Sequence, residues 1–161
     1  MATALAGLDA HIIGGSFFGY AAESTAGTMP TTGVTRLSQV TSLPSTNEAP
    51  PSVDMTRIGA TENTESIPGL RSLGTMAHVV NNGDTALTEY QAMVTAYNAA
   101  VSGSKGFWFF IGHENMDKCE AYKGTPGGYG TNGGGAADGN KATFYTTVGS
   151  QIEWVSVPTF A

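Results

Sequence analysis

The run Gly106 to Ile111 (GFWFFI) constrains the fold of this chain more than any other segment. Its side chains are apolar at successive positions, so it shows neither the alternation of a half-exposed strand nor the spacing of an amphipathic helix. A short continuous apolar run is typical of a strand that is buried on both faces. The chain must therefore surround this strand with other elements. A length of 161 residues suffices for one domain that buries roughly 68–70% of its unfolded surface.

One helix is predicted, from about Asp84 to Val101. Asp84 or Thr85 can cap its first turn, and Ser102–Gly103 supplies the stop. Apolar residues recur along it at spacings of three or four, which predicts one buried stripe. The residues of this stripe are Leu87, Tyr90, Val94, Tyr97 and Val101. We expect the helix to lie against one face of a sheet.

Strands are predicted on both sides of that helix, where β-branched or alternating segments are bounded by turn residues. These segments are residues 34–42, 53–61, 71–80, 142–148 and 151–158. Gly149–Ser150, between the last two, is typical of a two-residue hairpin turn. The order of strands, one helix and strands predicts an α+β, mainly β fold. We expect an antiparallel β-barrel or sandwich with one flanking helix over about 84–101 and long loops.

Two segments have no regular hydrophobic period. Residues 1–33 are rich in Ala, Gly, Ser and Thr, and they predict an N-terminal arm or extended loop that becomes ordered against a neighbour. Residues 124–139 (GTPGGYGTNGGGAADG) predict a long Gly-rich loop. Residues 34–161 would then form a single domain that contains this loop.

Composition excludes several functional classes. Charged residues make up 12% of the chain and the net charge is −6, so there is no basic patch for nucleic-acid phosphates. No stretch approaches about 18 consecutive apolar residues, the length needed to span a membrane. Cys119 is the only cysteine, which excludes an intrachain disulfide and a Cys-rich zinc site. Met1 to Gly7 carries no Lys or Arg, so we expect no secretory signal and synthesis in a reducing cytoplasm.

Candidate motifs for binding or metal ligation favour structural interpretations. Gly128 to Gly133 satisfies the spacing G-x-G-x-x-G, but no helix is predicted after it, so a loop is favoured over a nucleotide site. Potential metal ligands gather in one short segment, at His113, Glu114, Asp117 and Cys119. Their spacing matches no zinc pattern and favours a solvated turn.

Catalytic and stacking constellations are also missing from the sequence. There is no Gly-x-Ser-x-Gly elbow and no recognisable carboxylate pair, and His78 lies on a predicted strand where a structural histidine is favoured. Trp108 and Trp154 lack neighbouring Lys or Arg, which favours core packing over stacking on bases or sugars. We predict that the protein is not an enzyme and uses no cofactor and no metal.

Four short segments follow one another in an order typical of one protein family. They are residues 37–42 (LSQVTS), 50–51 (PP), 53–56 (VDMT) and 65–71 (ESIPGLR). In this order they resemble the major tail tube proteins of phages with long, non-contractile tails. The most specific element is the Ile67–Leu70 segment, expected to form a turn between strands, with Asp54 and Thr56 upstream. The similarity covers about residues 34–160, while the arm before Val34 and the length of the Gly-rich loop depart from the family pattern.

The resemblance implies a structural virion protein that forms hexameric rings, stacked into the hollow tube through which viral DNA is ejected into the host cell. The implied partners are further copies of the chain and the tail terminator, tape-measure and tail-tip proteins. Viral DNA would pass only transiently through an acidic lumen that repels phosphates, and no membrane insertion is implied. The protein would be made and assembled in the host cytoplasm and would reside in the virion tail.

Specific positions are candidates for assembly or structural roles. They are Phe17, Phe18, Tyr20, Ile67, Pro68, Gly69 and Leu70. Two other functional classes stay open at this point. The first is a non-enzymatic β-sandwich adhesin or carbohydrate-binding module, and the second is a small hydrolase that uses Cys119 or a Ser nucleophile.

Overall fold

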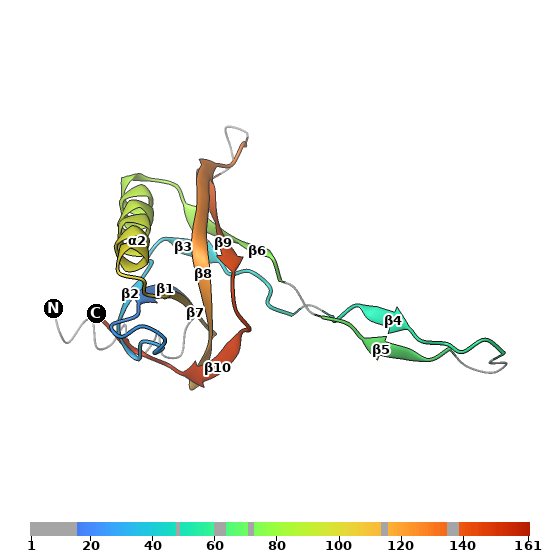
Figure 1. The fold of residues 1–161 in the computed structure, drawn as a ribbon. Coiled ribbons are helices and arrows are strands. Elements are labelled where there is room, and N and C mark those ends of the chain that lie inside the picture. The colour runs from blue at the N-terminus through green and yellow to red at the C-terminus, as the bar shows by residue number, and fades with distance from the viewer. Residues whose placement is uncertain (1–15, 48, 60–63, 71–72, 114–115, 135–138) are drawn as a thin grey trace.

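The computed structural model describes residues 16–47, 49–59, 64–70, 73–113, 116–134 and 139–161. Figure 1 shows a β-rich body with one helix against it and a two-stranded hairpin that extends away from the body. The strands of the body are β1 (Phe17–Ala22), β2 (Thr32–Arg36), β3 (Val40–Ser42), β6 (Thr75–Asn81), β7 (Phe107–Gly112), β8 (Lys118–Thr131), β9 (Lys141–Val148), β10 (Glu153–Ser156) and β11 (Thr159–Phe160). The helix is α2 (Asp84–Ser102), and the hairpin consists of β4 (Ser52–Asp54) and β5 (Ser66–Pro68).

The predicted fold class is confirmed, because the protein is mainly β with one helix flanking a large sheet. The strands of the body lie in the order β11-β2-β1-β7-β8-β9-β6-β3, and β10 pairs with β8 beside this path. Neighbouring strands are antiparallel except β11 and β2, which are parallel. Over the described residues the sheet begins at β11 and ends at β3, so it does not close into a barrel. Of the two predicted alternatives, the structure has the sandwich.

The long strand β8 joins the two parts of the sheet. Its first half pairs with β7 on one side and with β10 on the other, and its second half pairs with β9. The predicted hairpin turn at Gly149–Ser150 is therefore wrong: β9 and β10 do not face each other but follow one another along β8. At their junction Gly149 N–H donates to the carbonyl of Lys123 at 2.8 Å.

The apolar run 106–111 forms β7, and the prediction that it is buried on both faces is confirmed. All six residues of β7 are buried. Phe107, Phe109 and Ile111 belong to the core beneath α2, whereas Trp108 and Phe110 belong to a second core on the opposite face. Because side chains alternate along a strand, one continuous run supplies both cores.

The predicted helix is confirmed as Asp84–Ser102, with Gly103 as its C-cap, but the predicted stripe is confirmed only in part, because Tyr90 and Tyr97 pack against the core and Leu87 and Val101 do not. Ala86, Met93 and Ala100 are its buried residues, whereas Leu87 and Val101 are 40% and 52% exposed. Gly83 occupies the N-cap position, and no described side chain caps the first turn. No helix in the described part of the chain is long and apolar enough to cross a membrane.

The expected N-terminal arm contains a central strand of the sheet instead. Residues 1–15 lie outside the described part of the chain, but Phe17–Ala22 form β1, which pairs with both β2 and β7. Phe18 is fully buried. At Gly19 an added Cβ would lie 2.8 Å from Val34 Cγ1, so glycine there permits close packing rather than indicating a loop.

The predicted Gly-rich loop 124–139 is also largely wrong, because residues 124–131 are the second half of β8. The connection to β9 spans only residues 132–140, part of which lies outside the described residues. The single strand predicted for residues 34–42 is two strands in the structure, because β2 ends at Arg36 and β3 begins at Val40. The segment 71–80 is confirmed in part as β6, which buries Met76, His78 and Val80.

Candidate assembly interface

The hairpin formed by β4 and β5 is a separate two-stranded sheet. Ser52 lies opposite Pro68, Val53 opposite Ile67, and Asp54 opposite Ser66. The Ile67–Leu70 segment is therefore not the predicted turn, because Ile67 and Pro68 belong to β5. Within the described residues of the predicted strand 53–61, only Val53 and Asp54 lie in a strand, β4, and residues 60 and 61 lie outside the described part of the chain. Gly59, near the outer end of the described part of the hairpin, has a φ of +95°.

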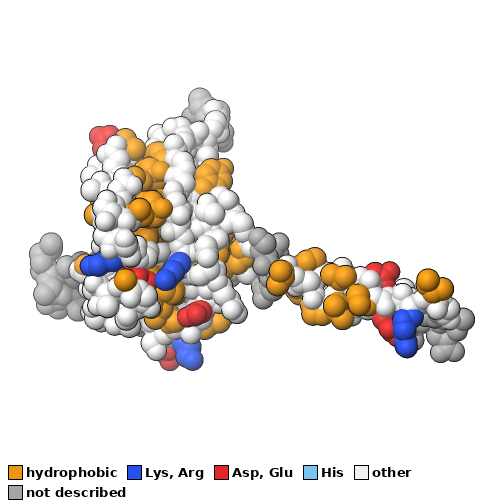
Figure 2. Space-filling model, viewed as in Figure 1, with side chains coloured by type: hydrophobic (Ala, Val, Ile, Leu, Met, Phe, Trp, Pro, Cys, Tyr) orange, Lys and Arg blue, Asp and Glu red, His pale blue; other side chains and the backbone are white. Residues whose placement is uncertain are grey.

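One face of the hairpin is apolar. Val53 and Ile67 share a face because they are directly opposed, and Pro51 and Met55 join them because side chains alternate along a strand. The exposed fractions of Val53, Met55 and Ile67 are 46%, 54% and 52%. Figure 2 shows hydrophobic side chains gathered along the hairpin. We call Pro51, Val53, Met55 and Ile67 the apolar face of the hairpin.

Two further large apolar side chains are exposed at the ends of the hairpin. Ile58, near the outer end, is fully exposed, and Leu70, where the hairpin rejoins the body, is 95% exposed. Exposed apolar side chains gathered on one projecting element are typical of a protein–protein interface. A two-stranded hairpin alone is also only marginally stable in water, so contact with another surface would stabilise it.

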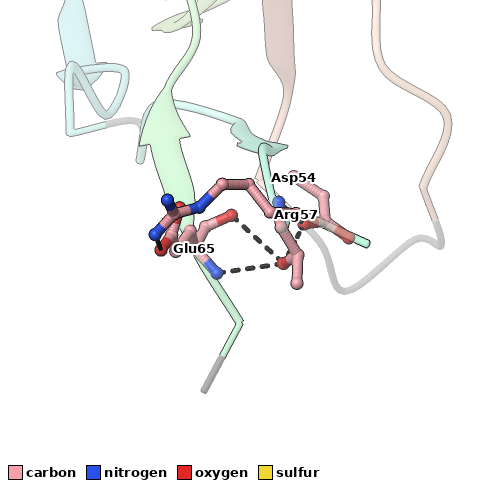
Figure 3. Close-up of polar contacts among 4 residues, drawn as sticks. Asp54, Arg57 and Glu65 are labelled. Atoms are coloured by element: carbon pink, nitrogen blue, oxygen red, sulfur yellow. Dashed lines mark hydrogen bonds and ion pairs between the residues drawn. The ribbon is translucent and has the colours of Figure 1, made fainter. Parts of the chain in front are cut away.

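Polar contacts hold the outer part of the hairpin in register (Figure 3). Thr56 N–H donates to Asp54 Oδ1 at 2.8 Å, and the Thr56 hydroxyl also donates to that oxygen. These hydrogen bonds from Thr56 hold the pKa of Asp54 below its usual value. Glu65 N–H donates to Thr56 Oγ1 at 2.9 Å across the hairpin, and Arg57 pairs with Glu65 at 2.9 Å.

Gly69 closes the inner end of the hairpin. Its N–H donates to the carbonyl oxygen of Pro51 at 2.5 Å. A Cβ at this position would lie 3.1 Å from that oxygen and from Pro51 Cγ. Glycine at this position is thus favoured by the close approach of Pro51.

A groove of about 570 Å³ lies at the root of the hairpin. Leu70 and Leu73 line it from the chain after β5, and Ile152 and Trp154 line it from β10 and the segment before it. Trp154 is 50% exposed, so the predicted core role holds for Trp108, which is buried, but not for Trp154. Sequence reasoning missed this groove, because its lining residues are distant in sequence.

We call this groove the root groove, and Glu120 is an acidic residue that lines it. Its carboxylate is buried, and its two oxygens accept hydrogen bonds from the Thr46 hydroxyl at 2.8 and 2.9 Å. His113 Nε2 lies 3.5 Å from Glu120 Oε2, so this histidine contacts a carboxylate that the sequence did not associate with it. Thr46 lies in the chain before β4, and its hydrogen bond to Glu120 connects the root of the hairpin to β8.

The remaining chemical candidates are not brought together as a site. Within the described residues no group of three or more His, Cys, Asp and Glu side chains is placed to hold a metal, and Glu114 lies outside those residues. Cys119 is fully buried, and burial raises the pKa of its thiol to about 11. In the Gly128–Gly133 segment, residues 128–131 lie in β8, and β9 is the element that follows.

His78 is a buried structural residue, as predicted from its position on a strand. Its Nε2 lies 2.9 Å from Thr146 Oγ1, which lies 2.7 Å from the Tyr122 hydroxyl. Its ring stacks on Phe144 with centroids 4.9 Å apart. Burial lowers the pKa of His78 to about 3, so the imidazole is neutral at physiological pH.

The candidate assembly positions thus separate into two groups. Phe17, Phe18 and Tyr20 are buried in the subunit's own cores, with exposed fractions of 6%, 0% and 7%. The second group lies on the projecting hairpin and comprises Ile67, Pro68, Gly69 and Leu70.

Comparisons with known proteins give a fold but no family. No protein-family model and no curated protein matches the sequence. A similar solved structure is a chain of "Cryo-EM structure of the anti-feeding prophage (AFP) baseplate, 6-fold symmetrised". The TM-score is 0.51 with 6% sequence identity, over 89% of this chain and 93% of that chain. At this identity the likeness shows that the two chains share a fold over nearly their whole lengths.

Proposed function

We propose that this protein is a structural subunit of a phage particle, and specifically a tail tube subunit that forms stacked hexameric rings. The exposed apolar face of the projecting hairpin is the observation that carries this proposal. A subunit that acted alone would expose Val53, Met55 and Ile67 to water, whereas one that packs against other subunits would bury them.

Two further observations support the proposal. The solved structure with a similar fold belongs to a baseplate that was symmetrised six-fold, which is the ring symmetry proposed here. The net charge of −6 suits a tube that passes DNA, because an acidic lumen repels phosphates and does not retain the genome. In this role the rings form the conduit for ejection of viral DNA into the host cell. Tail terminator, tape-measure and tail-tip proteins are the proposed partners, and the virion tail is the proposed location.

Assembly of the purified protein tests the proposal. Negative-stain microscopy and sedimentation velocity should reveal rings or tubes in a concentration-dependent equilibrium with monomer. A discrete monomer or trimer at every concentration would contradict the tube function, and glycan binding by that species would favour the alternative adhesin or carbohydrate-binding module.

A matched pair of hairpin variants tests the observation that carries the proposal. Val53→Lys with Ile67→Glu puts charges at the centre of the apolar face but keeps an attractive pair across the strands. Ser52→Glu with Ser66→Lys adds the same two charges to the opposite face. We expect the first variant to remain a folded monomer and the second to assemble. Equal assembly of the two variants would show that the apolar face is not an interface.

A further inference from the structure

We infer that the root groove is the receptor for the hairpin of a second copy of this chain. The inference rests on the proposed function and deepens it, because it names both surfaces of one contact between subunits. The occupant is the apolar face of the incoming hairpin with Arg57 beside it. The receptor is formed by Leu70, Leu73, Ile152 and Trp154 with Glu120.

The two surfaces match in hydrophobicity. The apolar face presents a row of side chains that are about half exposed, and the root groove presents Trp154, 50% exposed, and Leu70, 95% exposed. Leu73 and Ile152 are half-buried between them. Docking removes both apolar surfaces from water, and an aromatic side chain in a groove is typical of the residues that dominate binding energy.

The two surfaces also match in charge. Arg57 follows the apolar face on the same side of the hairpin, and its side chain is 83% exposed. Its ion pair with Glu65, which is 51% exposed, is of the surface kind that contributes little stability, so changing partner costs little. Glu120 has a buried carboxylate that accepts hydrogen bonds from Thr46 and can accept more. A guanidinium at the mouth of the groove would complement that charge.

A second copy is the occupant because the hairpin cannot reach its own groove. The run from Ser52 to Gly59 extends over about 23 Å at roughly 3.3 Å per residue, and Figure 1 shows it leading away from the body. Thr46 and Gly69, at the root, line the groove themselves. The hairpin and the groove are different surfaces of one subunit, so their contact is heterologous and generates a ring or a filament when repeated.

The first test compares two variants on β10. Trp154→Lys replaces the aromatic side chain of the groove and puts a cation where Arg57 should bind, close to its cross-strand neighbour Glu120. Glu153→Gln changes the net charge by the same amount on the opposite face of β10. We expect Trp154→Lys to raise the concentration needed for assembly by about tenfold or more, as loss of a central aromatic residue does. The control should stay within about twofold of the parent protein.

The second test mixes two subunits that each fail to assemble alone. One carries Val53→Lys with Ile67→Glu and keeps its groove, and the other carries Trp154→Lys and keeps its hairpin. The intact hairpin should dock in the intact groove and give a heterodimer that grows no further. Two added cysteines should then trap this contact as a disulfide. Ile58→Cys is added to the hairpin of the subunit that carries Trp154→Lys, and Gln151→Cys is added to the groove of the subunit that carries Val53→Lys with Ile67→Glu.

The outcomes separate this inference from the proposed function. Failure of the parent protein to assemble overturns both. Normal assembly by Trp154→Lys overturns the inference and leaves the tube function standing, and so does the absence of both heterodimer and disulfide on mixing. Circular dichroism and urea midpoints equal to those of the parent protein establish that each variant is folded.

Discussion

The indole Nε1–H of Trp108 donates a 2.9 Å hydrogen bond to Glu23 Oε1 across 85 residues of sequence. Gly27 and Gly106 donate their N–H groups to Glu23 Oε2 at 2.7 and 2.9 Å, and Lys123 Nζ lies 3.0 Å from Oε1. The Glu23 side chain is only 1% exposed. These donors, chiefly Trp108, hold its pKa at about 2. One carboxylate thus joins the chain after β1 to the start of β7 and the middle of β8.

Glu23→Gln should therefore destabilise the subunit strongly. The amide carries no charge to compensate Lys123, and its NH₂ group would face donors instead of acceptors. Breaking a buried charged network of this kind costs about 3–5 kcal/mol of unfolding free energy. Urea denaturation monitored by Trp fluorescence measures the change. Glu65→Gln, which removes an exposed ion pair, is the control and should cost about 0–1 kcal/mol. Similar losses in the two variants would show that the Glu23 network is not a major source of stability.

Acid should destabilise the protein over two overlapping pH ranges. His78 has a pKa near 6.5 when unfolded and about 3 when folded, so below pH 6.5 the unfolded chain binds a proton that the folded chain excludes. Unfolding free energy should fall from pH 6.5 towards pH 3 for this reason. The stabilisation from Glu23 is complete above its unfolded pKa of 4.5 and should be lost as pH falls from there towards about 2.

His78→Phe separates these two contributions. An aromatic ring can keep the stacking on Phe144, and Thr146 keeps its hydrogen bond with Tyr122. The decline in stability between pH 6.5 and 4.5 should become shallower, while the decline below pH 4.5 should persist. Urea midpoints measured across this range test the assignment. An unchanged slope above pH 4.5 would mean that another group is responsible.

Cys119 should be chemically inert in the folded subunit and dispensable for assembly. Its side chain is fully buried, and a thiol with a pKa of about 11 carries almost no thiolate at pH 8. Ellman's reagent should react with the protein only after denaturation. Cys119→Ser should assemble with a modest loss of stability, since the serine hydroxyl can donate to the Ser156 carbonyl that the thiol contacts. Rapid labelling of native protein would contradict this picture.

Two glycines of β8 should respond oppositely to alanine. A Cβ at Gly124 would press directly against the Thr147 carbonyl oxygen, so Gly124→Ala should cost about 1–3 kcal/mol through overpacking. At Gly128 no described atom lies within 4 Å of an added Cβ. Gly128→Ala should therefore stabilise the subunit by about 0.4–1 kcal/mol by restricting the unfolded chain. Thermal unfolding of the pair provides the comparison, and equal shifts would show that strand 124–131 does not pack as described.

Glycine also explains where sequence reasoning failed on the fold. The 124–131 segment predicts a loop because glycine is rare in strands, yet Gly124 and Gly127 lie where β9 approaches too closely for a side chain. Phe17–Ala22 contains Gly19 and two alanines, which weaken its strand propensity. Pairing with β7 on one side and β2 on the other overrides that propensity.

Elements whose signals are local could be predicted from the amino-acid sequence alone. The continuous apolar run made β7 a strand buried on both faces, and periodicity with a terminal glycine defined α2. Long-range packing sets which face of α2 is buried, which residues donate hydrogen bonds to Glu23 and which residues line the root groove. It also leaves Val53 and Ile67 facing water on a projecting hairpin. Val53 and Ile67 share a face because the register of β4 and β5 places them directly opposite each other, and whether that face meets the core depends on where long-range pairing directs the chain.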